Sequence, residues 1–154
     1  MRVIDPIKID EGKLLESNVE REPYGEWDPT IVYRRGRRTL VTDPGIQKIY
    51  ESLHPNIEKY PPNNLLGPYP AWVEVGPMSI WSMFQEVPDL QSRNKESIEV
   101  LIAPGEDFDA ISLHGLQSRI LKVELLDEND QVVHERVVDL MYTIPDENCH
   151  VRSV

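Results

Sequence analysis

The sequence predicts a mainly β protein, with a small β-rich module at the N-terminus and an antiparallel β-sandwich after it. Three observations lead to this prediction. Apolar and polar residues alternate over short runs in the C-terminal half, which is the period of a half-buried strand. Clusters of turn-forming residues separate these runs at short intervals. The chain also has 13 prolines in 154 residues, and proline lacks the backbone donor that helices and central strands require.

Four segments of the C-terminal half have the pattern of strands. They cover residues 98–102, 110–113, 120–126 and 132–141. The last two flank the polar turn Asp127–Asp130, so we expect them to form a β-hairpin. In the first strand of this hairpin Leu121, Val123 and Leu125 alternate with charged residues, and we expect these three side chains to share one face.

The N-terminal half is less regular. Residues 31–33 and 39–42 flank a basic turn, and we expect them to pair as a hairpin. Residues 45–53 fit two structures, because Ile46, Ile49, Tyr50 and Leu53 have helical spacing. A helix this short is marginal, however, and Asp43-Pro44-Gly45 just before it is typical of a hairpin turn. We therefore favour a strand for this segment and keep the helix as the alternative.

A proline-rich segment follows. Prolines concentrate between Pro55 and Pro77, and we expect Pro55–Pro70 to form an irregular loop. A loop of this length is long for a compact domain, which favours a role in contacting a partner. We place the domain boundary at Val75-Gly76-Pro77, which gives an N-terminal module over residues 1–75 and a β-sandwich domain over residues 76–154.

The charge of the chain excludes some partners. It has 27 acidic and 16 basic residues, for a formal net charge of −11. Such a field repels phosphate, so nucleic acid and anionic membranes are disfavoured. No apolar run approaches the roughly 20 residues that span a bilayer, and residues 1–10 lack the apolar core of a signal peptide. We expect a soluble protein, made in the cytoplasm and not inserted into a membrane.

This acidic chain contains one cluster of basic residues. It consists of Arg34, Arg35, Arg37 and Arg38 around Gly36. Two interpretations stay open: a solvated hairpin turn, or an interface for an acidic partner protein or an anionic glycan.

The sequence predicts no enzyme and no cofactor. Nucleophilic catalysis needs a Ser or Cys beside an oriented base, and Ser112-Leu113-His114-Gly115 does not match a nucleophile elbow. The acidic clusters Glu106–Asp109 and Asp127–Asp130 lie in predicted turns, where carboxylates cap backbone amides. Either could attract calcium, but neither has the spacing of an EF-hand loop. We therefore predict no catalytic residue and no metal ligand.

The single cysteine fits this prediction. Cys149 has no second cysteine in the chain to form a disulfide with, and Cys149 and His150 together fall short of the four ligands of a structural zinc site. We interpret Cys149 as an incidental residue near the C-terminus.

A series of aromatic and turn-forming residues in the N-terminal half is the basis of a first resemblance. In order, it consists of Trp27, Tyr33-Arg34-Arg35-Gly36, Leu40-Val41, Tyr50-Glu51-Ser52, Pro61-Pro62 and Trp72. The order resembles the chitin- and cellulose-binding modules of the type 5/12 class, although Arg37 replaces the usual polar residue and the insertion before the last Trp is longer. In such modules exposed rings stack on sugars. The resemblance implies that Trp27, Tyr50 and Trp72 bind a polysaccharide; the alternative is that these rings form the core.

A second resemblance covers residues 5–142. The segment Gly76-Pro77-Met78-Ser79-Ile80-Trp81-Ser82-Met83-Phe84 follows the first aromatic set. This arrangement resembles small tail-associated virion proteins of tailed bacteriophages, in which a β-sandwich comes next. Ser79-Ile80 and Gln85 depart from the family pattern, while Ala110–Leu116 fits it.

The second resemblance implies a fold, a function and a location. The sandwich would be of jelly-roll or galactose-binding-like type. The protein would be a structural component of the phage tail tip or fibre, present in multiple copies in the virion and synthesised in the host cytoplasm. Its partners would be other virion tail proteins and copies of itself, with host-surface polysaccharide as a further candidate. The alternative is a polysaccharide-binding module that uses exposed aromatic rings.

Overall fold

The computed structural model describes residues 6–87, 90–142 and 149–152. The described part of the protein is mainly β, and its sheets are antiparallel, which confirms the prediction of a mainly β protein. Two compact units divide the chain, Met1–Asp107 and Phe108–Val154.

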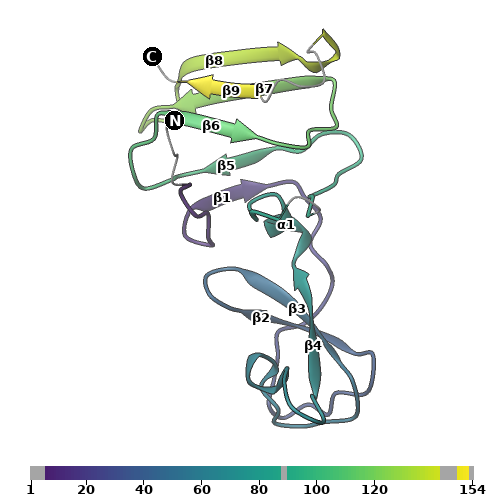
Figure 1. The fold of residues 1–154 in the computed structure, drawn as a ribbon. Helices are drawn as coiled ribbons and strands as arrows, with labels where there is room; N and C mark the ends of the chain where they lie inside the picture. The colour runs from purple at the N-terminus through teal and green to yellow at the C-terminus, as the bar shows by residue number, and fades with distance from the viewer. Residues whose placement is uncertain (1–5, 88–89, 143–148, 153–154) are drawn as a thin grey trace. The chain divides into compact units, whose positions relative to one another are not determined.

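The centre of unit 1 is a three-stranded sheet in the order β2-β3-β4 (Figure 1). Its strands are β2 (Arg38–Thr42), β3 (Gln47–Ser52) and β4 (Trp72–Pro77). The strand that we favoured over a helix for residues 45–53 is therefore confirmed. The turn at Gly45, with φ at +74°, returns the chain so that Leu40 lies opposite Ile49. Glycine adopts this backbone conformation without a Cβ penalty.

The predicted pairing of residues 31–33 with 39–42 is wrong. Strand β2 pairs with β3 instead, and Tyr33 forms an isolated antiparallel bridge with Asn56. The Arg34–Arg37 turn exists, with Arg37 N donating to Arg34 O at 3.0 Å. Within this turn Gly36 N donates to Ser52 O, and Ser52 N donates to Arg37 O. Strand β2 therefore pairs with β3, which follows it through the turn at Gly45.

The central sheet buries side chains on both of its faces. One cluster of buried side chains consists of Leu40, Ile46, Ile49, Met78, Ile80 and Trp81. The other consists of Tyr33, Val41, Tyr50, Ala71 and Trp72. Successive residues of a strand point to opposite faces, so neighbours such as Leu40 and Val41 belong to different clusters. Each of these residues is at most 9% exposed, and this two-sided packing is the core of unit 1.

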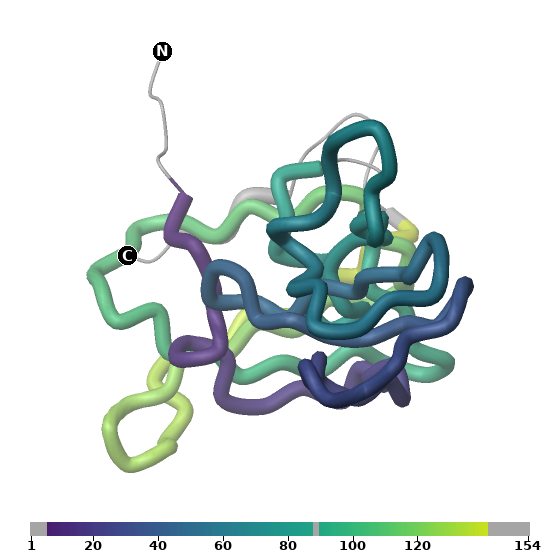
Figure 2. The backbone as a smooth tube through the Cα atoms, turned by 90° about the horizontal axis from the view of Figure 1, so that it is seen from below, coloured from purple at the N-terminus to yellow at the C-terminus, as the bar shows by residue number. Residues whose placement is uncertain are grey.

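The proline-rich segment between β3 and β4 is irregular, as predicted, apart from the 3-10 helix η1 (Pro61–Asn64). Figure 2 shows this part of the chain doubling back on itself. Hydrogen bonds hold its base closed: Ala71 N donates to Asn64 O at 3.0 Å, and Asn64 Nδ2 donates to Tyr60 O at 2.8 Å. The loop is thus an ordered part of unit 1.

Unit 1 also contains a two-stranded sheet and a short helix. Strand β1 (Leu14–Ser17) pairs with β5 (Val100–Ile102), which lies within the predicted strand 98–102. The short helix α1 (Ser79–Ser82) carries Trp81 into the cluster with Leu40. The domain boundary that we predicted at residues 75–77 lies inside β4, and residues 76–107 belong to the same compact unit as the N-terminal module.

Unit 2 contains two two-stranded sheets. Strand β6 (Ala110–Leu113) pairs with β9 (Cys149–Arg152), and β7 (Ile120–Leu126) pairs with β8 (Val132–Asp139). The predicted hairpin over residues 120–141 is confirmed, except that its second strand ends at Asp139 and the 3-10 helix η2 (Leu140–Tyr142) follows.

The two strands of the β7–β8 hairpin distribute their apolar residues differently. Leu121, Val123 and Leu125 share one face of β7 and are half-buried, as predicted. Register pairs place Val137 opposite Lys122, on the other face, where Val137 is 58% exposed. Strand β8 therefore turns apolar side chains toward solvent.

The core of unit 1 makes a direct prediction for stability. Trp72→Ala removes a ring that is 1% exposed and should destabilise unit 1 by about 3–5 kcal/mol. Chemical denaturation followed by circular dichroism measures this loss. As a control, Tyr69→Ala removes a ring that is 89% exposed and should change stability by less than about 0.5 kcal/mol. Equal losses in the two variants would contradict the assignment of Trp72 to the core.

Candidate functional site

The three rings that resemblance assigned to sugar binding lie in or beside one core cluster. Tyr50 is 0% and Trp72 1% exposed, and Trp27 is half-buried and packs against them. Trp72 meets Tyr33 edge-to-face, with ring centroids 5.0 Å apart. Its indole N–H donates to Lys59 O at 2.8 Å. Rings in these positions fill the core, and neither Tyr50 nor Trp72 offers a face on which a sugar could stack.

Trp27 is the exception among the three. It meets Tyr60 edge-to-face at 5.1 Å, and Tyr60 is 36% exposed. Its indole N–H is buried and has no hydrogen-bond partner among the residues that the structure describes. The pair Trp27–Tyr60 thus lies at the border between the core and the proline-rich loop.

The Tyr50 hydroxyl lies beside acidic groups. It donates to Glu74 Oε2 at 3.4 Å, and Lys48 Nζ lies 3.4 Å from Glu74 Oε1. Burial raises the pKa of Tyr50, and the nearby negative charges of Glu74 and Asp43 raise it further. Tyr50 is therefore held in its neutral form, which suits a packing role.

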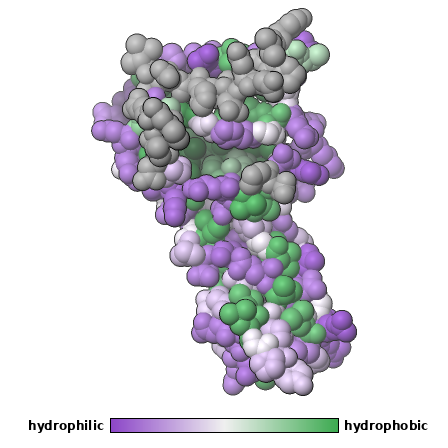
Figure 3. Space-filling model, in the orientation of Figure 1, coloured by the Kyte–Doolittle hydropathy of each residue, from purple (hydrophilic) through white to green (hydrophobic). Residues whose placement is uncertain are grey.

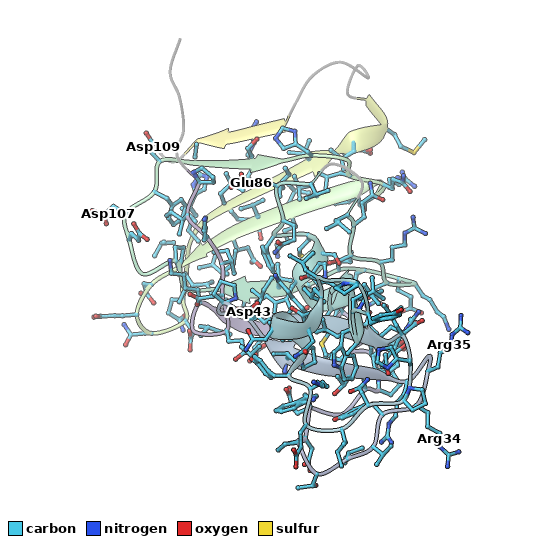
Figure 4. The ribbon with its side chains drawn as sticks, turned by 60° about the horizontal axis from the view of Figure 1, so that its bottom comes forward. Arg34, Arg35, Asp43, Glu86, Asp107 and Asp109 are labelled. Atoms are coloured by element: carbon cyan, nitrogen blue, oxygen red, sulfur yellow. The ribbon has the colours of Figure 1, made fainter. Side chains whose placement is uncertain are left out.

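The four arginines of the basic cluster have different surroundings. Arg38 Nε donates to Glu51 Oε2 at 2.8 Å, and both this bond and one to Tyr24 raise the Arg38 pKa. The Arg37 guanidinium lies 5.3 Å from the centroid of the Tyr33 ring. Arg34 and Arg35 are exposed and make no ion pair with any residue in the described part of the chain. Figure 4 shows both extending from the turn away from the ribbon.

The turn that holds Arg34 and Arg35 is tied to the proline-rich loop. Tyr33 and Asn56 exchange backbone hydrogen bonds of 2.8 and 2.9 Å, and Leu53 N donates to Ala71 O at 2.9 Å. Both segments therefore lie at the end of the central sheet where β4 begins (Figure 1). The space-filling view shows hydrophobic side chains at the surface of this part of unit 1 (Figure 3).

We call this end of unit 1 the distal surface. We define it by the exposed residues Val32, Arg34, Arg35, Ile57, Leu66 and Tyr69. Sequence patterns pointed to the arginines and to the loop, but not to Leu66 and Tyr69. The signal that could have found them is the turn-forming run Gly67-Pro68-Tyr69-Pro70, because turns and loops lie at the surface.

The acidic clusters have structural partners. Asp127 accepts backbone hydrogen bonds from Asn129 and Gln131, at 2.8 and 2.9 Å, and these bonds lower its pKa. Glu106 pairs with Lys13 at 3.3 Å. No group of three or more His, Cys, Asp or Glu that could hold a metal occurs in residues 6–87 and 90–142.

A serine and a histidine approach each other in unit 2. Ser112 Oγ lies 2.9 Å from His114 Nε2, and both residues are exposed. No carboxylate that the structure describes bonds to the other ring nitrogen to orient the imidazole. The side chains of Cys149 and His150, which we considered for zinc, lie outside the described residues.

Comparison with known proteins returns no match: no protein-family model, no curated protein and no solved structure matches this chain. The two family resemblances therefore stay predictions that depend on their motifs. Among the described residues, no helix is long and apolar enough to cross a membrane.

Because the Tyr50 hydroxyl is buried, we expect the free energy of unfolding to fall at alkaline pH. Tyrosine in an unfolded chain ionises near pH 10, whereas folded Tyr50 keeps its proton to higher pH. The contribution of neutral Tyr50 to the free energy of unfolding is complete below about pH 10. It is lost as the pH rises from there toward the pKa of folded Tyr50. We expect Tyr50→Phe to lose less stability than the wild type between about pH 9 and pH 11. Urea denaturation across this range tests it, and parallel pH profiles would contradict it.

Proposed function

We propose that this protein is a non-catalytic structural component of a bacteriophage tail that assembles in multiple copies. The supporting observation is the packing of unit 2. In residues 108–141 no side chain is buried, and every buried side chain of the described chain lies between Val19 and Ser82. Unit 2 nevertheless forms regular hairpin pairing. A small unit whose described strands bury no side chain would gain stability by association.

Exposed apolar side chains show where unit 2 would associate. Val132, Val133 and Val137 of β8 are 51–65% exposed, and Met141 just beyond is 71% exposed. A disulfide within the chain cannot replace a core, because Cys149 is the single cysteine. In the proposed assembly, copies or neighbouring tail proteins cover these side chains. The two-stranded sheets of unit 2 would then complete the β-sandwich that the sequence predicts.

The assignment to a phage tail has a narrower basis. It depends on the resemblance of Gly76–Phe84 and the preceding aromatic set to tail-associated virion proteins. Assembly in the virion would place the protein in the tail, with other tail proteins as neighbours. The polysaccharide-binding alternative requires exposed rings at Trp27, Tyr50 and Trp72. The burial of the last two favours assembly over sugar stacking.

Fractionation of virions tests the tail assignment. An antibody to this chain should detect it in gradient fractions that contain tail particles, after a high-salt wash that removes loosely bound protein. Detection solely in the soluble fraction at the top of the gradient would contradict the proposal. Binding of the free monomer to chitin beads would instead support the alternative.

Association through unit 2 has a consequence for native mass. Val133→Asp with Val137→Asp places charges at two exposed apolar positions of β8 and should convert an oligomer into a monomer. Sedimentation velocity measures the change. Val87→Asp with Leu15→Asp is a matched control, because these side chains of unit 1 are 52% and 57% exposed. A wild-type monomer at all concentrations, or equal dissociation by the control, would contradict association through β8.

A further inference from the structure

The distal surface of unit 1 combines exposed apolar groups with a loop that is hydrogen-bonded at its base. Leu66 is 92% and Tyr69 89% exposed, the highest values among the large hydrophobic residues of the described chain. Proline flanks Tyr69 on both sides, and Asn64 bonds close the loop at its base. Val32 and Ile57 flank the Tyr33–Asn56 bridge and are 54% and 46% exposed. The two prolines and the bonds at the base restrict the backbone, which lowers the conformational entropy that binding would cost.

The charge of the distal surface is opposite to that of the rest of the chain. Residues 31–37 and 53–71 contain four basic residues, namely Arg34, Arg35, Arg37 and Lys59, and one acidic residue, Glu58, for a net charge of +3. The whole chain carries −11, so the remaining residues carry −11 − 3 = −14. The distal surface is thus a cationic end on an acidic protein.

The side chains of this surface are those that protein interfaces use. Tyrosine and arginine are enriched at interface hot spots, and aliphatic groups add contact area around them. Arg34 and Arg35 have no ion pair in the described residues, so contact with a carboxylate breaks no existing pair. Guanidinium groups bind carboxylates in a bidentate geometry. The complementary partner is an acidic protein surface with some apolar area.

We propose that the distal surface docks on an acidic face of a second copy of this chain. The inference depends on the proposed multi-copy assembly and adds a second, electrostatic interface to it. Charge complementarity supports this choice of partner, because every copy carries both the cationic end and the excess of −14 elsewhere. The two surfaces in contact differ from each other, so the interface is heterologous and joins copies head to tail.

The test is the salt dependence of self-association, measured by sedimentation equilibrium of the full chain at about 0.05 M and about 0.5 M NaCl. Docking through the distal surface should weaken at high salt, whereas apolar association through unit 2 should persist. At low salt, Arg34→Glu with Arg35→Glu should raise the dissociation constant at least about tenfold. Leu66→Ser with Tyr69→Ser should do the same.

Two controls keep the result specific. Lys8→Glu with Lys95→Glu makes the same change in net charge at exposed sites outside the distal surface. Leu15→Ser with Val87→Ser replaces two apolar side chains outside the distal surface that are 57% and 52% exposed. Both should leave the dissociation constant within about twofold of wild type, in line with the small effects of rim substitutions. Circular dichroism confirms that each variant folds.

The outcomes separate this inference from the proposed function. Association that neither salt nor the distal variants weaken would overturn docking through the distal surface and leave assembly through unit 2 intact. Equal weakening by the controls would also overturn it, because net charge alone would then account for the effect. A wild-type monomer at both salt concentrations overturns the inference as well. Absence from tail particles, measured separately by fractionation, would overturn the proposed function.

Discussion

Two-sided burial of a small sheet is the constraint on which unit 1 depends. Strands β2 and β3 have apolar residues on both faces, with Leu40 and Ile49 on one and Val41 and Tyr50 on the other. Three short strands cannot cover either face themselves. Rings from outside β2 and β3 therefore close the core: Trp81 from α1 on one face, and Tyr33 with Trp72 on the other.

Because these aromatic rings are in the core, other side chains form the surface of unit 1. A buried Trp72 anchors the proline-rich loop by donating its indole N–H to Lys59 O. The bridge between Tyr33 and Asn56 fixes the arginine turn against the same loop. The core thus positions two exposed segments, and these segments present Leu66, Tyr69, Arg34 and Arg35. In the proposed docking, recognition by unit 1 would come from loops that its core holds in place.

Local patterns predicted the β class and the β7–β8 hairpin, because alternation and a polar turn depend only on neighbouring residues. Pairing between distant segments, such as β1 with β5, leaves no comparable local pattern. The predicted hairpin over residues 31–42 is wrong because β2 has a turn at each of its ends. It pairs with β3, across the turn at Gly45, along its whole length. The sequence could not predict whether the rings of Trp27, Tyr50 and Trp72 are buried or exposed. An aromatic ring on a short strand can fill a core or bind a sugar equally well.

The two units differ in how deeply their side chains are buried, and from this difference we propose that association stabilises the strands of unit 2. Unit 1 has its own core, whereas residues 108–141 bury no side chain. Hydrogen exchange of the full chain, compared between dilute monomer and concentrated oligomer, tests the claim most directly because amide protection reports local stability. We predict strong protection of β2–β4 at both concentrations and protection of β7–β8 in the oligomer alone. Equal protection of β7–β8 in the dilute monomer would contradict the account.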